Sequence, residues 1–209
     1  MAKKAKKTRA SQQSGFTLIE LLAVITIMGI LMMVAIPAVS RTIENSRRDT
    51  FADTATAYIN AVKNSVSADE ILCSTASDTN MTTNISSAVA GTYYLNVATE
   101  DNATYKANSA LDNSKALMES GGKSSWGNAN VRGYVVLTKD TTNNQTKYTY
   151  QIVLTDSGNH GTNGTSTGLV GTNNIVKRSD VSSSATLTYT STSLIKAPSN
   201  TTFVCKVDA

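Results

Sequence analysis

The stretch Ser14-Gly15-Phe16-Thr17-Leu18-Ile19-Glu20-Leu21-Leu22, SGFTLIELL, decides how this chain is organised. It joins a short basic segment to a long apolar run and places a carboxylate, Glu20, near the start of that run. A charged side chain is costly in an apolar segment, so one that is present usually has a partner or a task. The partner of Glu20 is therefore the first question that the sequence raises.

The apolar run covers residues 16–39, and Glu20 is its only charged residue. At about 1.5 Å per residue, a helix of this length covers about 36 Å, enough to cross a hydrocarbon core of about 30 Å. A cluster of lysines and one arginine precedes Gly15, with no acidic residue beside it: Lys3, Lys4, Lys6, Lys7 and Arg9. This basic flank predicts a cytoplasmic N-terminus and a body outside the cytoplasm.

The formal net charge of +4 comes from that N-terminal segment alone. Without its five basic residues, the chain has fourteen lysines and arginines against fifteen acidic residues, a net charge of −1. No basic patch is then left to neutralise phosphates, and nucleic-acid binding is not predicted.

Two ordinary interpretations of the N-terminus leave features unexplained. A secretory signal has an apolar core of about 7–15 residues followed by a small-residue cleavage site, whereas this run is longer and no such site follows Val39. A plain single-pass anchor accounts for the length and the orientation. It explains neither Glu20 nor Gly15 at the junction of the basic and apolar segments.

The junction Gly15-Phe16-Thr17-Leu18-Ile19-Glu20 resembles the processing motif of type IV pilins and related pseudopilins. The shared features are a short basic leader that ends in Gly, then Phe, then Glu as the fifth residue of the mature chain. Gly29 and Pro37 also fall where many pilins carry a helix-breaking pair. The resemblance implies an α+β, type IV pilin-like fold, in which a long N-terminal helix packs on a small antiparallel sheet.

The resemblance also implies roles for single residues. A membrane peptidase would cut between Gly15 and Phe16 and methylate the new amine of Phe16. Glu20 of one subunit would neutralise the Phe16 amine of another subunit and set the axial register. Gly29 and Pro37 would let the helix lose order in the filament. The alternative for Glu20 is a side chain that extends toward the lipid headgroups.

The chain divides into four predicted parts: a cleaved leader at 1–15, the hydrophobic helix at 16–39, an amphipathic continuation of this helix at 40–72, and a Ser/Thr/Asn-rich head at 73–209. One apolar stripe at spacings of three and four residues marks the continuation: Phe51, Ala55, Tyr58, Val62 and Val66.

Strands in the head are predicted from runs of β-branched and aromatic residues. The strongest cover 131–139 and 147–155, and the polar segment DTTNNQT joins them as a hairpin. Along 147–155, large apolar residues alternate with polar ones, which predicts one buried and one solvent-exposed face. Weaker strands are predicted at 93–97, 185–190 and 202–207. Residues 74–130 are predicted to form a variable connection.

The two cysteines are Cys73, at the predicted end of the helix, and Cys205, near the end of the sequence. Outside the cytoplasm an even number of cysteines permits a disulfide. Many pilins have a disulfide in their C-terminal region, which usually closes a shorter loop. The resemblance therefore implies a Cys73–Cys205 disulfide. Two free buried thiols are the alternative.

No motif points to catalysis, a metal or a cofactor. The string Gly122-Lys123-Ser124 has Leu117 where a phosphate-binding loop needs Gly. Residues 164–168 match G-x-S-x-G, but they lie in a loop-like sequence that follows the single histidine, His160. Some pseudopilins bind calcium in a C-terminal loop, so the resemblance alone makes residues 156–174 a candidate for calcium. No enzyme, no cofactor and no metal site are predicted.

The expected function is that of a structural subunit of a type IV pilus-like surface filament with adhesion or motility roles. Expected partners are copies of itself, other pilins, the prepilin peptidase and methylase, and the platform protein and ATPase of the assembly machinery. The chain would cross the inner or cytoplasmic membrane once before it enters the extracellular filament. Alternatives are a minor pilin, a pseudopilin of type II secretion or DNA uptake (competence), and a membrane-anchored binding domain outside this family.

Overall fold

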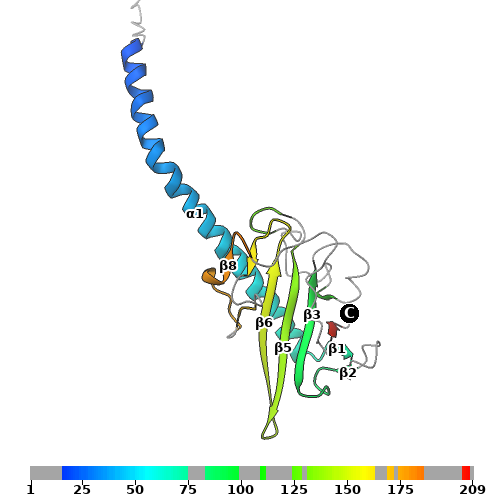
Figure 1. Cartoon of the computed structure of the whole chain (residues 1–209). Helices are drawn as coiled ribbons and strands as arrows, with labels where there is room; N and C mark the ends of the chain where they lie inside the picture. Colours follow the sequence, from blue (N-terminus) through cyan, green and yellow to red (C-terminus); the bar gives the residue numbers. More distant parts are fainter. Residues whose placement is uncertain are drawn as a thin grey trace, which may run out of the picture. The chain divides into compact units, whose positions relative to one another are not determined.

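The computed structural model describes eight stretches of the chain: residues 16–74, 83–98, 109–111, 124–128, 131–162, 169–171, 174–185 and 204–207 (Figure 1). The predicted leader, 1–15, lies outside them. The chain divides into two compact units, Met1–Ile43 and Glu44–Ala209. We call the first the N-terminal unit and the second the head unit; helix α1, Leu18–Ser67, contributes residues to both.

The N-terminal unit consists, in its described part, of the first half of α1. Its large apolar residues are exposed, from Phe16 with 90% to Ile43 with 47% of the residue surface accessible. The hydroxyls of Ser40 and Thr42 donate to carbonyl oxygens of their own helix, at Ile36 (2.9 Å) and Ala38 (3.0 Å), so they offer little polarity outward. Among the described helices, only α1 is long and apolar enough to cross a membrane.

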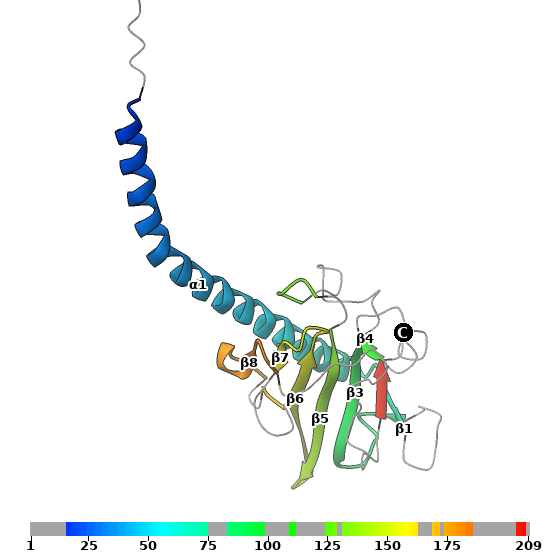
Figure 2. The ribbon, with the colours of Figure 1, turned by 45° about the horizontal axis from the view of Figure 1, so that its top comes forward.

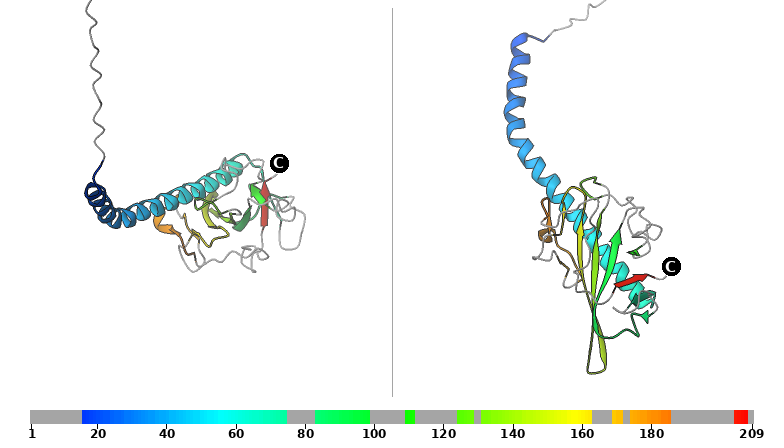
Figure 3. Two further views of the ribbon diagram at one scale, coloured as in Figure 1. Left: turned by 90° about the horizontal axis from the view of Figure 1, so that it is seen from above. Right: turned by 45° about the vertical axis from the view of Figure 1, so that its right-hand side comes forward.

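The second half of α1 packs on the sheet of the head unit (Figures 2 and 3). The five residues of the predicted stripe are all buried, as are Ala52 and Ile59 on the same side of the helix. The stripe is therefore confirmed. Period-3.6 spacing identified it because a helix must bury one continuous face to gain from packing.

The helix ends at Ser67, earlier than the predicted end near Leu72. Asp69 has a left-handed backbone (φ 58°), its N–H bonds to the Val66 carbonyl at 3.2 Å, and the N–H of Glu70 bonds to the Ser65 carbonyl at 3.0 Å. This double closure is a Schellman motif, which satisfies the last carbonyls and turns the chain away. The chain can then enter a strand, and Leu72 belongs to that strand.

The described part of the head unit contains one sheet of nine strands. Their bounds are β1 Ile71–Ser74, β2 Thr83–Asn84, β3 Gly91–Ala98, β4 Ser109–Leu111, β5 Arg132–Thr142, β6 Gln145–Thr155, β7 Gly161–Thr162, β8 Val181–Ser182 and β9 Val204–Val207. The order is β2-β1-β9-β3-β5-β6-β7-β8, with β4 beside β3. Pairing is antiparallel except where β3 meets β4 and β9. The predicted α+β class is confirmed.

The hairpin of β5 and β6 confirms the two strongest strand predictions, but the strands run further than expected. Their turn is only Asn143-Asn144, with φ of 54° and 60°. Two consecutive positive φ angles are those of a type I′ turn, which matches the twist of the flanking strands and which asparagine tolerates. The polar DTTNNQT segment therefore continues the ladder instead of forming a loop.

The weaker strand predictions agree with the structure only in part. The one at 93–97 lies within β3, and the described part of the one at 202–207 is β9, since residues 202 and 203 lie outside the described stretches. The one at 185–190 lies outside the described residues apart from Ala185, which is not in a strand. The described residues of the predicted connection at 74–130 include β2, β3 and β4, which belong to the sheet.

The head unit has apolar contacts on both faces of its sheet. The large core lies between α1 and one face. On the other face Tyr134, Val136 and Val153 are buried together, with Tyr94 and Leu169 packed against them. The predicted solvent-exposed face of β6 is therefore wrong at Thr155, which is fully buried, and Val153 on the same face is fully buried as well. The local alternation was correct, but contacts from distant residues cover the second face.

Candidate functional site

The first turn of α1 holds Glu20 in a local hydrogen-bond arrangement. The Thr17 backbone N–H and the Thr17 hydroxyl each donate to Glu20 Oε2 at 2.8 Å. The Glu20 N–H donates back to the Thr17 hydroxyl at 3.4 Å. This is a capping box, and its Thr-x-x-Glu pattern can be read from the sequence. Within one chain, the carboxylate thus has a partner in its own helix.

The remaining predicted residues of this region are placed along α1. Phe16 precedes the helix and is exposed, while Gly29 and Pro37 both lie inside it. A Cβ added at Gly29 would meet no atom within 4 Å, so in the single chain this glycine serves no close approach. Loss of helical order at Gly29 and Pro37 in a filament stays a prediction, and Gly15 lies outside the described residues.

The apolar side chains of the N-terminal unit form the surface that most requires a partner. They are exposed on all sides of the helix between Leu18 and Val39. Soluble monomers rarely expose apolar patches larger than a few hundred Å², and larger ones mark membrane or protein contacts. The arrangement is suited to a bilayer, to copies of the same helix, or to both in turn.

The two cysteines are brought opposite each other in the sheet. Cys73 belongs to β1 and not to the end of the helix, which is a correction to its predicted place. In the antiparallel pairing of β1 with β9, the Cα partner of Cys73 is Cys205. Directly opposed antiparallel residues have Cα separations of about 4.5–5.5 Å, within the range that a disulfide spans.

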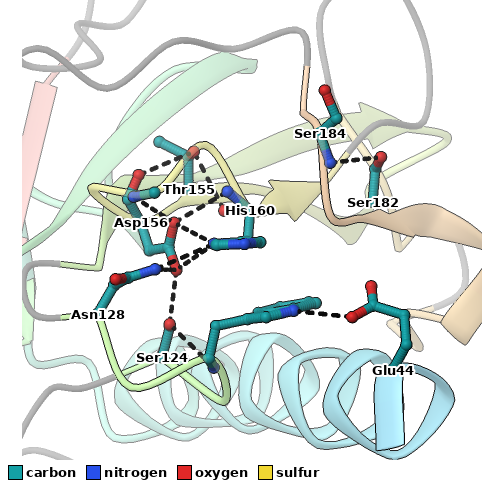
Figure 4. A network of polar contacts seen from close by, with 10 residues as sticks. Glu44, Ser124, Asn128, Thr155, Asp156, His160, Ser182 and Ser184 are labelled. Atoms are coloured by element: carbon teal, nitrogen blue, oxygen red, sulfur yellow. Dashed lines mark hydrogen bonds and ion pairs between the residues drawn. The ribbon is translucent and has the colours of Figure 1, made fainter. Parts of the chain in front are cut away.

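A polar cluster surrounds Asp156 in the head unit (Figure 4). Asp156 is fully buried, and its carboxylate accepts from the Ser124 hydroxyl at 2.6 Å and from Asn128 Nδ2 at 3.1 Å. The backbone N–H groups of Gly158 and His160 donate to it at 2.8 and 2.9 Å, and His160 Nδ1 lies at 2.9 Å. Burial raises the pKa of Asp156, but these donors and the nearby imidazole outweigh it, and the pKa is lowered.

The cluster contains serine, histidine and aspartate but cannot act as a catalytic triad. A triad needs the serine hydroxyl bonded to the imidazole, whereas the Ser124 hydroxyl donates to Asp156. The same donors saturate the carboxylate, which leaves it no oxygen for a cation. Among the described residues, no group of three or more His, Cys, Asp or Glu could hold a metal ion. Residues 122, 123 and 164–168 lie outside the described stretches.

Trp126 connects this cluster to α1. Its ring stacks on His160, with ring centroids 4.4 Å apart and planes 9° apart, and its indole N–H donates to Glu44 Oε2 at 3.1 Å. Glu44 also accepts from Arg48 at 3.1 Å, and Trp126 contacts Phe51 at a centroid distance of 5.8 Å. The turn at 124–128 therefore fastens the helix to the β6–β7 loop. No periodicity relates these residues, so sequence analysis missed them.

Lys139 is a second polar anchor that sequence analysis missed. It is 5% exposed, and its Nζ donates to the carbonyl oxygens of Ile85 (3.0 Å), Ser86 (2.6 Å) and Ala88 (2.7 Å). Three acceptors satisfy all three ammonium protons. The contact ties β5 to the turn before β3 and has no catalytic geometry.

Comparison with known proteins identifies the N-terminal segment. Residues 10–36 match the model of the prokaryotic N-terminal methylation motif. The predicted resemblance is confirmed for this segment, which carries the N-terminal methylation motif that is typical of type IV prepilin signal peptides. Searches of curated proteins and of solved structures gave no match. The motif supports membership of the type IV pilin and pseudopilin family, whose members are processed by a prepilin peptidase and assemble with other pilins.

Proposed function

We propose that this protein is a structural subunit of a type IV pilus-like surface filament. The observation that carries the proposal is the exposure of the apolar half of α1, most of which lies within the methylation motif at residues 10–36. From Glu44 onward, the described part of the chain forms a packed head. The apolar half would span the inner or cytoplasmic membrane before assembly and line the filament afterwards. We propose roles in adhesion or motility, and no catalytic activity of the chain's own.

Processing would create the partner for Glu20. A prepilin peptidase would cut between Gly15 and Phe16, and methylation would leave a positively charged secondary amine on Phe16. In a filament this amine would lie among apolar helices, where an unpaired charge is very costly. Glu20 of a neighbouring subunit would compensate it and so select one axial register. Until then, Thr17 holds the carboxylate at the start of its own helix.

Cohesion of the filament would come from the apolar half of α1. In lipid, helix association gains little from the hydrophobic effect because lipid tails are as apolar as leucine. Once the platform protein and the assembly ATPase have moved the subunit out of the bilayer, the same surface can be removed from water only by packing against other copies. Gly29 and Pro37 would let this helix adapt to its neighbours.

The head would be closed by a Cys73–Cys205 disulfide, which the β1–β9 register supports. Strand β9 lies between β1 and β3, so it joins two parts of the sheet that do not pair with each other. A covalent link at this place would keep the last described strand in the sheet when the filament is under tension.

Blocking cleavage tests the proposal in cells of the natural host. Gly15→Leu places a branched side chain where the peptidase must approach the backbone closely. We expect this variant to accumulate in membranes at its precursor mass and to be missing from filaments sheared off the cells. Gly29→Ala, outside the cleavage junction, serves as the control and should still be cleaved. Gly15→Leu protein in sheared filaments would contradict the proposal.

A further inference from the structure

The tip of the β5–β6 hairpin carries the triplet Asn144-Gln145-Thr146. This is an N-x-[ST] sequence, the acceptor pattern for N-linked glycosylation of proteins outside the cytoplasm. From this triplet and its geometry we infer that Asn144 is a glycan attachment site. The inference rests on the proposed function only in so far as that function places the head outside the cytoplasm.

The tip is separate from the rest of the sheet. Strand β3 pairs with β5 only as far as Lys139, opposite Gly91. Beyond this point, among the described strands, β5 and β6 pair only with each other, through Thr142 and Gln145 (Figure 1). All residues from 140 to 147 are exposed. A transferase can therefore reach the acceptor in the folded head without breaking any contact of the core.

Asn144 itself is presented at the turn. Its backbone is left-handed (φ 60°), a conformation that asparagine and aspartate adopt more readily than other residues with a side chain. No hydrogen bond to its side chain occurs among the described residues, and the side chain is exposed. Its Nδ2 is thus available for a new bond.

The other described triplet of this type, Asn84-Ile85-Ser86, shows the contrast. Asn84 Nδ2 donates to Asp69 Oδ2 at 3.0 Å, and Ile85 is fully buried. The Ser86 carbonyl accepts from Lys139. This triplet could enter an active site only if the head unfolded locally. Triplets beginning at Asn80, Asn102, Asn163 and Asn200 lie outside the described residues.

The reaction needs a sugar activated as a polyprenyl diphosphate, the class of donor that is carried on the outer side of a membrane. Asn144 Nδ2 attacks the anomeric carbon, and a C–N bond forms. The C–O bond to the diphosphate breaks, polyprenyl diphosphate leaves with the electron pair, and Nδ2 loses one proton to a base of the transferase. Nothing is oxidised or reduced.

A glycan at this place has a physical consequence for the filament. The two strands of the tip leave backbone groups at both edges without a described strand neighbour. Open edges can pair with strands of other molecules. A bulky sugar at the turn would hinder edge pairing between copies that are held side by side at high local concentration.

Mass spectrometry of the protein purified from its natural host tests the inference. Trypsin releases the peptide 140–147, DTTNNQTK, between Lys139 and Lys147. We expect this peptide to carry a sugar mass that electron-transfer fragmentation places on Asn144. Asn144→Asp and Thr146→Val should remove the sugar. Asn143→Asp, which makes the same chemical change one residue earlier in the same turn, and Thr146→Ser should keep it.

An unmodified peptide from the native protein would overturn the inference, and so would a sugar on Asn143 or on a threonine, or one that persists in Thr146→Val. The N-terminus of the same sample separates the two proposals. A chain that begins at methylated Phe16 with a bare Asn144 refutes the glycan alone. A glycosylated chain that keeps its leader refutes the filament function alone. Trp126 fluorescence during thermal unfolding shows that each variant retains its folded head.

Discussion

Glu20 and Thr17 form a closed pair at the start of α1, in which the Glu20 carboxylate accepts from both the N–H and the hydroxyl of Thr17 at 2.8 Å. A capping interaction needs only an acceptor oxygen at this place. The neutralisation of an amine needs a negative charge. The two roles of Glu20 can therefore be separated by chemistry, because glutamine keeps the oxygen and loses the charge.

Substitution of Glu20 should distinguish these roles. We expect Glu20→Gln and Glu20→Ala to reduce the yield of sheared filaments alike, by roughly tenfold or more, since a buried amine without a counter-charge is strongly unfavourable. Cleavage after Gly15 should remain largely intact in both. Filament yield and precursor mass are measured on the same cultures.

Glu20→Asp, which keeps the charge on a shorter side chain, is the control and should retain part of the assembly. Abundant filaments from Glu20→Gln would mean that the glutamate serves as a helix cap only.

The pH dependence of the head should reflect Asp156. Its pKa is lowered in the folded protein, so its contribution to stability is complete above the ordinary pKa of aspartate and is lost as the pH falls through the lower, folded value. We expect the free energy of unfolding of the detergent-solubilised full chain to fall below about pH 4. The fluorescence of Trp126, the single tryptophan, follows unfolding at this site.

Asp156→Asn should lower the free energy of unfolding at neutral pH by about 2–4 kcal/mol, because several buried donors lose a charged acceptor. It should also flatten the acid limb of the stability profile. Asp53→Asn, on the exposed side of α1, should do neither. An unchanged acid limb in Asp156→Asn would show that other carboxylates control the transition.

Removal of the Lys139 ammonium should destabilise the head, because three carbonyl oxygens lose their hydrogen-bond donor. Lys139→Met keeps the length of the side chain but leaves the carbonyls of Ile85, Ser86 and Ala88 without this donor. We expect a loss of about 2–4 kcal/mol in urea unfolding. The exposed Lys147→Met should change stability by less than about 0.5 kcal/mol. Equal effects of the two substitutions would contradict the anchoring role of Lys139.

The proposed disulfide can be tested by counting thiols. Denatured wild-type protein from the cell surface should contain no free thiol. The Cys73→Ser/Cys205→Ser double variant should lose about 2–5 kcal/mol in its free energy of unfolding. The chain-entropy model predicts a value near the upper end of this range, because the disulfide would close a long loop. Two reactive thiols per wild-type chain would refute the disulfide, although the β1–β9 pairing would stand.

The parts of the fold that the sequence predicted are those set by local patterns. The α1 stripe from Phe51 to Val66 follows helical periodicity, and the β5–β6 hairpin follows alternation on either side of an asparagine pair. The end of α1 was misplaced because Asp69, with its left-handed backbone, is a less obvious stop signal than glycine. The burial of the second face of β6 was not predicted because Tyr94 and Leu169, which pack against the cluster that contains Val153, come from distant parts of the chain.

The candidate sites, too, could be predicted only where their residues are contiguous in the sequence. The methylation motif and the Thr17–Glu20 capping box are both contiguous patterns that can be read from the sequence. The Asp156 cluster and the Trp126–His160 stack depend on how a turn, a loop and a helix come together, and no spacing in the sequence encodes that. No spacing in the sequence encodes the place of β9 between β1 and β3 either, and this place puts Cys205 opposite Cys73.

The proposed filament function requires that Phe16 becomes the methylated N-terminus of the assembled subunit. N-terminal mass spectrometry of the protein in filaments sheared from cells measures this. We expect a mature chain that begins at Phe16 and carries one added methyl group. A chain that still begins at or near Met1, found only in membranes, would refute the filament function and would leave Glu20 with its capping role alone.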